Sequence, residues 1–196
     1  MADMAAGPIG WERALMAGEK VKDRLRRATK ALDDARVPYA VVGGNAVAEW
    51  VGRVDEEAVR TTRDVDLLLR RADLTSARTA LEAAGFVYYQ LLDVDMFIDG
   101  PEGKPSGAVH VLFAGEKVRP EDSHAAPDLD ESERAAEFQV ATLPALVRMK
   151  LIANRRKDQV HLQDLIGVGL IDATWLVRFP PPLGERLQQL LDDPNG

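Results

Sequence analysis

The chain has 196 residues, 46% of them hydrophobic, which is enough to bury the core of one domain with a small helical appendage. Its net charge of −7 argues against a general nucleic-acid-binding surface and leaves only a local basic patch for contact with RNA or DNA. It contains no cysteine, no apolar run that could span a bilayer and, in residues 1–10, no signal segment, so we expect a cytoplasmic protein with no membrane contact, disulfide or cysteine-ligated zinc.

The first part of the chain predicts a helix, a strand, a turn and a second helix. Residues 11–37 carry apolar side chains near helical spacing among many charges, which indicates one long or two short amphipathic helices that cover a sheet. Pro38 ends this region. The apolar run 39–42 is typical of a buried strand, and the glycine pair 43–44 bounds it before a helix at 45–51.

The middle of the chain alternates strand and helix patterns. In order, we expect a strand at 65–69, a helix at 73–84, an extended pair within 86–98 and a strand at 108–113. Asp73 is expected to be the N-cap of the helix and Gly85 to end it. A turn near Asp93 should divide the extended pair.

The last part of the chain is predicted to be mainly helical. Residues 115–133 are polar, acidic and contain proline, which indicates a long surface loop that could act as a lid. The elements expected after it are a strand at 137–141, helices at 143–156 and from 158 onward, and helices at 175–179 and 183–191 on either side of prolines 180–182. Asp158 is expected to be the N-cap of its helix.

This order of elements predicts an α/β (α+β) fold in which helices flank a small mixed β-sheet. Three parts are expected along the chain. They are an N-terminal helical segment at 1–36, an α/β core at 37–141 and a helical part at 142–196 that packs on the core.

Two aspartates and a glycine pair are the most informative residues in this pattern. Asp64 and Asp66 are two apart at the start of a strand, so their carboxylates emerge on one face, beside the turn formed by Gly43 and Gly44. Carboxylates in this arrangement can hold a hard divalent cation against a phosphate.

Each half of this pattern also has a purely structural interpretation. A glycine pair after a strand is commonly only a turn. The acids could be solvated or could pair with Arg60 or Arg63. Two parallel carboxylates repel each other, however, and favour a cation between them, so the combination favours a site for a metal and a nucleotide.

The glycine pair, the following helix and the stretch Arg60-Thr61-Thr62-Arg63-Asp64-Val65-Asp66 resemble the nucleotidyltransferase superfamily, whose fold is similar to the palm of DNA polymerase beta. Three later stretches resemble the lysine, arginine and aspartate helix pair of the AbiEii-type nucleotidyltransferases and their bacterial relatives: 149–151, 155–158 and 161–165. The resemblance covers about residues 37–172 and implies a sheet of nucleotidyltransferase type.

The resemblance implies transfer of a nucleoside monophosphate from an NTP to a hydroxyl group on a small molecule, a tRNA end or a protein. Asp64 and Asp66 would bind Mg²⁺ or Mn²⁺, which bridges the triphosphate and the attacking hydroxyl. Main-chain N–H groups of the glycine pair and of the next helix would meet the phosphates. The nucleotide-binding residues that we expect are Gly43, Gly44, Asn45, Arg63, Lys150 and Asp158.

The third catalytic acid of the superfamily has no direct counterpart in this sequence. Active members place it on a neighbouring strand, where this chain has His110. A neutral histidine can ligate a metal, with a preference for ions softer than Mg²⁺ such as Mn²⁺ or Zn²⁺, or it can take the proton of the acceptor hydroxyl. A structural role is the remaining interpretation of His110. Asp95, on another predicted strand, is an equal candidate for the missing carboxylate.

The helix pair supplies the expected cation. By the resemblance, Lys150 faces the cleft and meets the triphosphate, although lysines and arginines at a helix end also offset the helix dipole in solvent. Asp158 could cap the next helix or position Lys150. His161 and Asp164 lie three apart on one helical face, which is more typical of a supporting or surface pair than of a metal site.

Two hypotheses therefore follow from the sequence. The first is a metal-dependent nucleotidyltransferase with Asp64, Asp66, and either His110 or Asp95 in the catalytic set. The second is a nucleotide-binding module with weakened catalysis, such as a toxin–antitoxin partner or a nucleotide sensor. The identity of the third group distinguishes the two hypotheses, and no feature of the sequence points to a particular oligomeric state.

Overall fold

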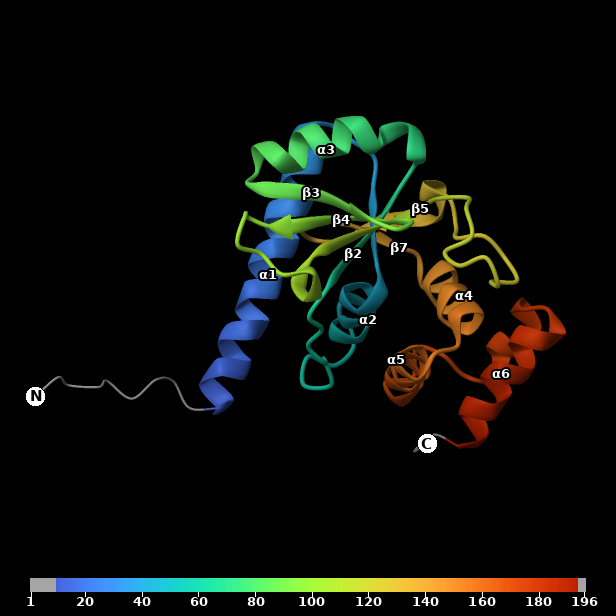
Figure 1. Cartoon of the computed structure of the whole chain (residues 1–196). Helices are drawn as coiled ribbons and strands as arrows, with labels where there is room; N and C mark the ends of the chain where they lie inside the picture. The colour runs from blue at the N-terminus through green and yellow to red at the C-terminus, as the bar shows by residue number, and fades with distance from the viewer. Residues whose placement is uncertain (1–9, 194–196) are drawn as a thin grey trace, which may run out of the picture.

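A computed structural model describes residues 10–193, which form a mixed α/β fold around one seven-stranded sheet (Figure 1). The strands lie in the order β3-β4-β5-β2-β1-β7-β6. Their bounds are Ala40–Val42 (β1), Val65–Leu69 (β2), Phe86–Leu91 (β3), Val94–Asp99 (β4), Val109–Phe113 (β5), Ser132–Arg134 (β6) and Gln139–Ala141 (β7). The β1–β7 and β2–β5 pairs are parallel and the other neighbouring strands are antiparallel, so the sheet is mixed as expected.

Helices pack on both faces of this sheet. Their bounds are Gly10–Asp34 (α1), Gly43–Gly52 (α2), Leu74–Ala83 (α3), Leu143–Ala153 (α4), Arg156–Gly167 (α5) and Pro181–Asp192 (α6). α1 and α3 pack on each other and on the sheet, while α2 packs on β1 and β2 and contacts α4 and α5. Figure 1 shows α3 and α2 on opposite sides of the sheet. Between residues 10 and 193, no helix has both the length and the apolar character that a membrane span requires.

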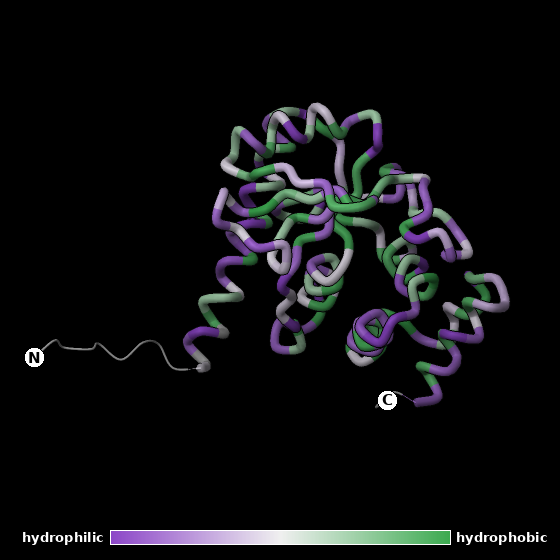
Figure 2. The backbone as a smooth tube through the Cα atoms, in the orientation of Figure 1, coloured by the Kyte–Doolittle hydropathy of each residue, from purple (hydrophilic) through white to green (hydrophobic). Residues whose placement is uncertain are grey.

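The central strands are largely hydrophobic, as the green stretches of the tube in Figure 2 show. All three residues of β1 are buried, and on β2 the run of buried residues is interrupted only at Asp66, which is partly exposed. Strands that are covered on both faces become continuous apolar runs, which is why β1 and β2 could be located from sequence. Asp66 is therefore the one polar residue of β1 and β2, and it lies at the candidate functional site.

Several predicted elements are confirmed. The region predicted as one long or two short helices at 11–37 forms one long helix, α1, which ends at Asp34. β2 has the predicted bounds, and a turn at Leu92 and Asp93 divides β3 from β4. Gly85 follows α3 with a φ of +89°, which is the left-handed conformation expected at a helix end.

Other details differ from the expectation at helix starts. Asp73 precedes α3, but its side chain makes no capping hydrogen bond. α5 begins at Arg156, so Asp158 is its third residue rather than its N-cap; from there its Oδ2 accepts a hydrogen bond from the Arg155 N–H at 3.3 Å. Pro181 is the first residue of α6 rather than part of a break before it, because N–H groups in the first turn need no intrahelical partner.

Candidate functional site

The turn between β1 and α2 brings the backbone against Asp66. Gly43 has a φ of +68°, which L side chains rarely adopt. A Cβ added to Gly43 would lie 1.9 Å from Asp66 Oδ2, so only glycine fits at this position. A Cβ added to Gly44 would lie 2.9 Å from Thr62 Oγ1. The first N–H groups of α2, which have no partner within the helix, therefore begin beside the Asp66 carboxylate.

Asp66 lies on β2, and Asp64 directly precedes this strand. Both side chains are partly exposed, at 24% and 30%, so neither carboxylate is buried in the core. Two side chains hold the backbone that carries them: Asn45 Nδ2 donates to the Asp64 carbonyl at 2.7 Å, and Arg24 Nη1 donates to the Arg63 carbonyl at 3.3 Å. The amide of Asn45 thus positions the acidic segment.

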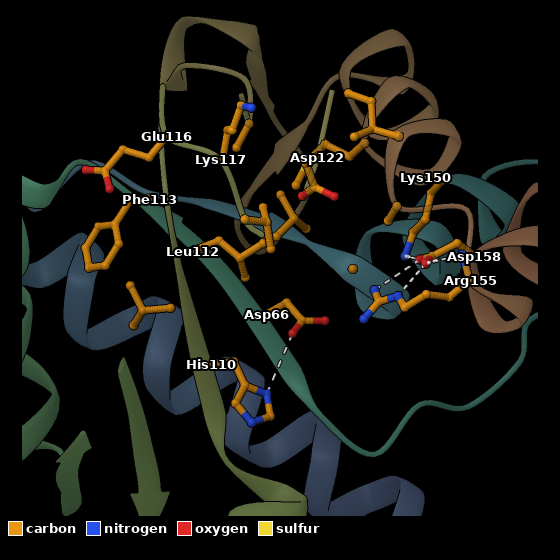
Figure 3. Close-up of a pocket in the computed structure, with 18 of the residues that line it drawn as sticks. Asp66, His110, Leu112, Phe113, Glu116, Lys117, Asp122, Lys150, Arg155 and Asp158 are labelled. Carbon is orange, nitrogen blue, oxygen red and sulfur yellow. Dashed lines mark hydrogen bonds and ion pairs between the residues drawn. The ribbon is translucent and has the colours of Figure 1, made fainter. Parts of the chain in front are cut away.

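His110 faces Asp66 across the β2–β5 pair. The strand register places the two residues opposite each other, and His110 Nδ1 lies 3.7 Å from Asp66 Oδ1, as the dashed line in Figure 3 shows. Interaction with Asp66 outweighs burial and raises the pKa of His110, and the nearby Asp64 charge acts in the same direction. His110 therefore belongs to the same charged group as the two aspartates.

Asp95 lies on the other face of the sheet. On β4 it pairs with Val111, whereas its neighbour Met96 pairs with His110, so the Asp95 side chain points away from Asp66. It is 2% exposed and accepts a hydrogen bond from the Tyr88 hydroxyl. The structure brings His110, and not Asp95, to the aspartate pair.

The residues at this site fit a divalent metal that arrives with a nucleotide. Within residues 10–193, no three His, Asp or Glu side chains cluster closely enough to form a metal site by themselves. Asp64 and Asp66 nevertheless provide the hard oxygen donors that Mg²⁺ prefers, and Mg²⁺ is commonly held by one or two carboxylates together with substrate phosphates and waters. The close approach of Gly43 to Asp66 leaves no side chain over this carboxylate.

The α4–α5 corner brings three cations to the same side of the cleft. Lys150 Nζ lies 3.1 Å from Asp158 Oδ1, and Arg155 Nε lies 2.6 Å from Asp158 Oδ2. Lys157 Nζ lies 4.0 Å from Asp64 Oδ2. Figure 3 shows Lys150, Arg155 and Asp158 together on the side of the pocket that faces Asp66.

The Lys150–Asp158 pair is buried, with side chains 8% and 1% exposed. Burial lowers the pKa of Lys150, although Asp158 and then Asp66 favour its charged form. For Asp158, burial would raise the pKa, but hydrogen bonds from Arg155 and Lys150 together lower it below its usual range. Asp158 is therefore an ionised anchor that holds two cations in place.

These groups line one cleft of about 590 Å³, a size suited to a small-molecule ligand. Seven of the ten residues expected from sequence line it: Gly43, Gly44, Asp64, Asp66, His110, Lys150 and Asp158. The other three do not: Asn45 binds the Asp64 carbonyl, Asp95 lies on the opposite face, and the Arg63 side chain is exposed.

The loop after β5, which the sequence predicted as a long surface loop that could act as a lid, forms a wall of the cleft. Its lining residues include Glu116, Lys117 and Asp122 (Figure 3). Arg71 makes two bonds to the Glu116 carboxylate, at 2.7 and 2.6 Å, and stacks on the Phe113 ring. The loop is thus anchored at its base, and the sequence signals for it were its length and its polar, acidic and proline-containing composition.

No protein-family model matches the sequence, and no curated protein does. Solved structures do match the fold. An antigenic nucleotidyltransferase-like protein from Paracoccidioides brasiliensis is 18% identical, with a TM-score of 0.58 over 89% of this chain and 88% of that chain. A candidate nucleotidyltransferase from H. pylori is 16% identical, with a TM-score of 0.50 over 92% of this chain and 77% of that chain. The chain therefore has a nucleotidyltransferase-like fold.

Proposed function

We propose that the protein is a metal-dependent nucleotidyltransferase that moves a nucleoside monophosphate from an NTP to a hydroxyl acceptor and releases pyrophosphate. One observation carries the proposal: the Asp66 carboxylate lies against the glycine turn at the start of α2, and Asp64 lies two residues before it. A helix N-terminus favours phosphate and paired carboxylates favour a divalent cation, so the turn and the acids complement the two parts of a metal–nucleotide complex. The likeness of the fold to nucleotidyltransferase structures supports the same function.

Positive charge for the triphosphate comes from the α4–α5 corner. Lys150 is held toward the cleft by Asp158, and Lys157 lies beside Asp64. A cation fixed by a buried partner, as Lys150 is by Asp158, needs little rearrangement when a phosphate arrives, which stabilises the charge that develops on the phosphate oxygens during transfer. Gly43 and Gly44 would contribute main-chain N–H groups to the same phosphates.

Asp64 and Asp66 would hold Mg²⁺ or Mn²⁺. When bound, such an ion neutralises phosphate charge and favours the deprotonated form of an attacking hydroxyl. His110, next to Asp66, is the side chain positioned to take the proton of that hydroxyl once its ring is neutral. Asn45 and Arg24 keep the backbone of the acidic segment in place.

The proposal is tested by incubating the protein with labelled ATP, CTP, GTP or UTP, Mg²⁺ or Mn²⁺, and a small-molecule extract, total tRNA or protein extract as acceptor. Transfer of label should be lost in Asp64→Ala and in Asp66→Ala. Asp73→Ala is the matched control, because this side chain makes no capping bond. Label transfer that persists in both site variants would contradict the assignment.

A second candidate function is a nucleotide-binding module with weakened catalysis, such as the partner of a toxin. It is favoured by His110, which faces Asp66 where a third carboxylate was expected, and by the position of Asp95 on the opposite face. This candidate predicts that NTP binds with either metal but that no acceptor receives label. Restoring an acid with His110→Asp should then create or raise activity.

A further inference from the structure

Residues at regular spacing on helix α5 face residues at regular spacing in the segment before β2. Asp164 Oδ1 accepts from Arg60 Nε at 2.8 Å, and Lys157 Nζ lies 4.0 Å from Asp64 Oδ2. Lys157, His161 and Asp164 are spaced i, i+4 and i+7, so they lie along one helical face. Between Arg60 and Asp64, the corresponding middle residue is Thr62.

Thr62 and His161, which would form the middle contact, do not bond to each other. Thr62 Oγ1 and His161 Nδ1 are both buried without a hydrogen-bond partner within the described chain. His161 is 9% exposed. Buried polar atoms are nearly always paired, so two unpaired atoms from facing segments call for a shared partner.

A small void lies where that partner would sit. Its volume is about 20 Å³ and it is lined by Thr62 and His161 together with Gly44, Val47, Ala48, Val51, Ala58, Arg60, Thr61 and Asp164. This space accommodates one water molecule, which needs a cavity of about 10–15 Å³ or more and two to four polar partners. A larger ligand does not fit.

We propose that one buried water molecule occupies this void and bridges Thr62 Oγ1 to His161 Nδ1. Water suits both partners because it donates and accepts, as the threonine hydroxyl does. Burial, followed by the charges of Lys150 and Lys157, lowers the pKa of His161 to about 4, so its ring is neutral at pH 7. A neutral ring nitrogen accepts or donates according to its tautomer, and water can match either one.

The water makes Thr62 and His161 positioning residues. Thr62 lies against Gly44 of the turn and two residues before Asp64, so the bridge fixes both against α5. The water site is supported by the void together with the two buried atoms, Thr62 Oγ1 and His161 Nδ1. Its effect on the placement of Asp64 rests on the proposed function.

Thr62→Val tests the water through the sign of its effect on stability. With the bridge present, the isosteric valine removes a hydrogen bond and leaves the water and His161 poorly paired, which should lower Tm by about 2–8 °C. Thr62→Ser keeps the hydroxyl and should restore most of the loss. Thr75→Val, on the exposed surface of α3, is the matched control and should leave Tm nearly unchanged.

If the void holds no water, Thr62→Val should have the opposite effect on Tm. Thr62→Val would then remove an unpaired buried hydroxyl, so an unchanged or higher Tm would overturn the proposal. Absence of water density between the two side chains in a crystal structure at about 1.5 Å resolution would do so as well. The ring ¹⁵N chemical shifts of His161 should change in Thr62→Val and not in Thr75→Val.

A double-mutant cycle tests whether the two side chains share one partner. Thr62→Val and His161→Leu each remove one end of the bridge, so the Tm loss of the double variant should be clearly smaller than the sum of the two single losses. Additive losses would overturn the bridge. Affinity for an Mg²⁺–NTP complex should fall in Thr62→Val and recover in Thr62→Ser. If the wild type binds no NTP, the proposed function fails while the density, the Tm signs and the ¹⁵N shifts still decide the water.

Discussion

At the scale of single residues, the contact between Gly43 and Asp66 is the tightest constraint in the site. The sequence predicted that glycine would allow a ligand to approach the backbone. The structure shows that the first group to approach is the carboxylate of Asp66, 1.9 Å from where a Cβ would be. Because Gly43 has no side chain, the Asp66 carboxylate can occupy this position even before any ligand binds.

Gly43→Ala should displace Asp66 and abolish nucleotidyl transfer. The added methyl group overlaps the carboxylate, and the φ of +68° adds backbone strain of about 1–3 kcal/mol. Gly85→Ala is the matched control, because Gly85 has a φ of +89° and its added Cβ would meet nothing within 4 Å. Urea unfolding should show that both variants are destabilised by backbone strain, and Gly43→Ala more so because of the clash, whereas label transfer should be lost only in Gly43→Ala. Equal activity in the two variants would show that the clash with Asp66 does not matter.

His161 makes stability depend on pH. Its pKa is about 4 in the folded protein and near 6.5 in the unfolded chain, so between these values the unfolded state binds the additional proton. Stability should therefore fall as pH drops from 6.5 to 4, by roughly 3 kcal/mol in total from this group. His110 acts in a different window: its raised pKa adds stability that is complete below about 6.5 and is lost as pH rises through the folded value.

The measurement is urea unfolding from pH 4 to 7 for the wild type and His161→Gln. The variant should lose much of the slope below pH 6.5, and subtracting the two curves removes the contribution of the carboxylates. His124→Gln, on the exposed part of the loop after β5, is the matched control and should keep the wild-type slope. Parallel curves for the wild type and His161→Gln would rule out a buried neutral His161.

At the scale of elements, the corner between α4 and α5 shows why the site is built on a buried ion pair. Asn154, with a φ of +45°, ends α4 and lets α5 begin two residues later. The corner therefore places Lys150, near the end of α4, next to Asp158, near the start of α5. Because both side chains are buried, the charged form of each depends on the opposite charge of the other.

Asp158→Ala should lower the free energy of unfolding by about 3–5 kcal/mol, since it leaves Lys150 buried without its carboxylate. Asp34→Ala is the matched control: it removes an ion pair with Lys30 whose side chains are 65% and 75% exposed, and should cost no more than about 0.5 kcal/mol. In the double variant Lys150→Met/Asp158→Leu the loss should be smaller than in Asp158→Ala, because no buried unpaired charge remains; the other partner of Asp158, Arg155, is 52% exposed. Chemical denaturation measures all three. Similar losses in Asp158→Ala and Asp34→Ala would contradict the enclosed pair.

Elements that form the core could be predicted because burial on both faces leaves a continuous apolar run, as in β2. The three-residue strand β6 could not, since Ser132–Arg134 has no apolar pattern and pairs only with β7. Asp158 was misplaced by three positions, since it is the third residue of α5 and not its N-cap, because an acid can cap a helix from its first turn as well as from the N-cap.

Sequence could not decide between His110 and Asp95, because that choice depends on register. A shift of one residue between β4 and β5 would exchange the faces of Asp95 and Met96. The observed pairing places His110 beside Asp66. The glycine turn and the aspartate pair were predictable because both lie within short local patterns.

At the scale of the whole molecule, the cleft contains a local group of cations within an acidic chain. The net charge is −7, yet Lys150, Arg155 and Lys157 gather around two carboxylates at one end of α5. A polyanion is repelled by the overall charge and attracted only by this local group, which favours a ligand small enough to fit within the cleft. Metal and nucleotide should therefore bind together.

The linkage between metal, nucleotide and folding follows from this arrangement. Two carboxylates hold Mg²⁺ weakly when no phosphate completes its coordination, so Mg²⁺ alone should change Tm little. At about 100 times its Kd, an Mg²⁺–NTP complex should stabilise the fold by about 2.7 kcal/mol, which corresponds to a rise in Tm of about 5–10 °C. The rise should largely disappear with EDTA and in Asp66→Asn, while Asp73→Asn should retain it. An equal rise with NTP and EDTA would mean that the cations alone bind the nucleotide, and the aspartates would then need another role.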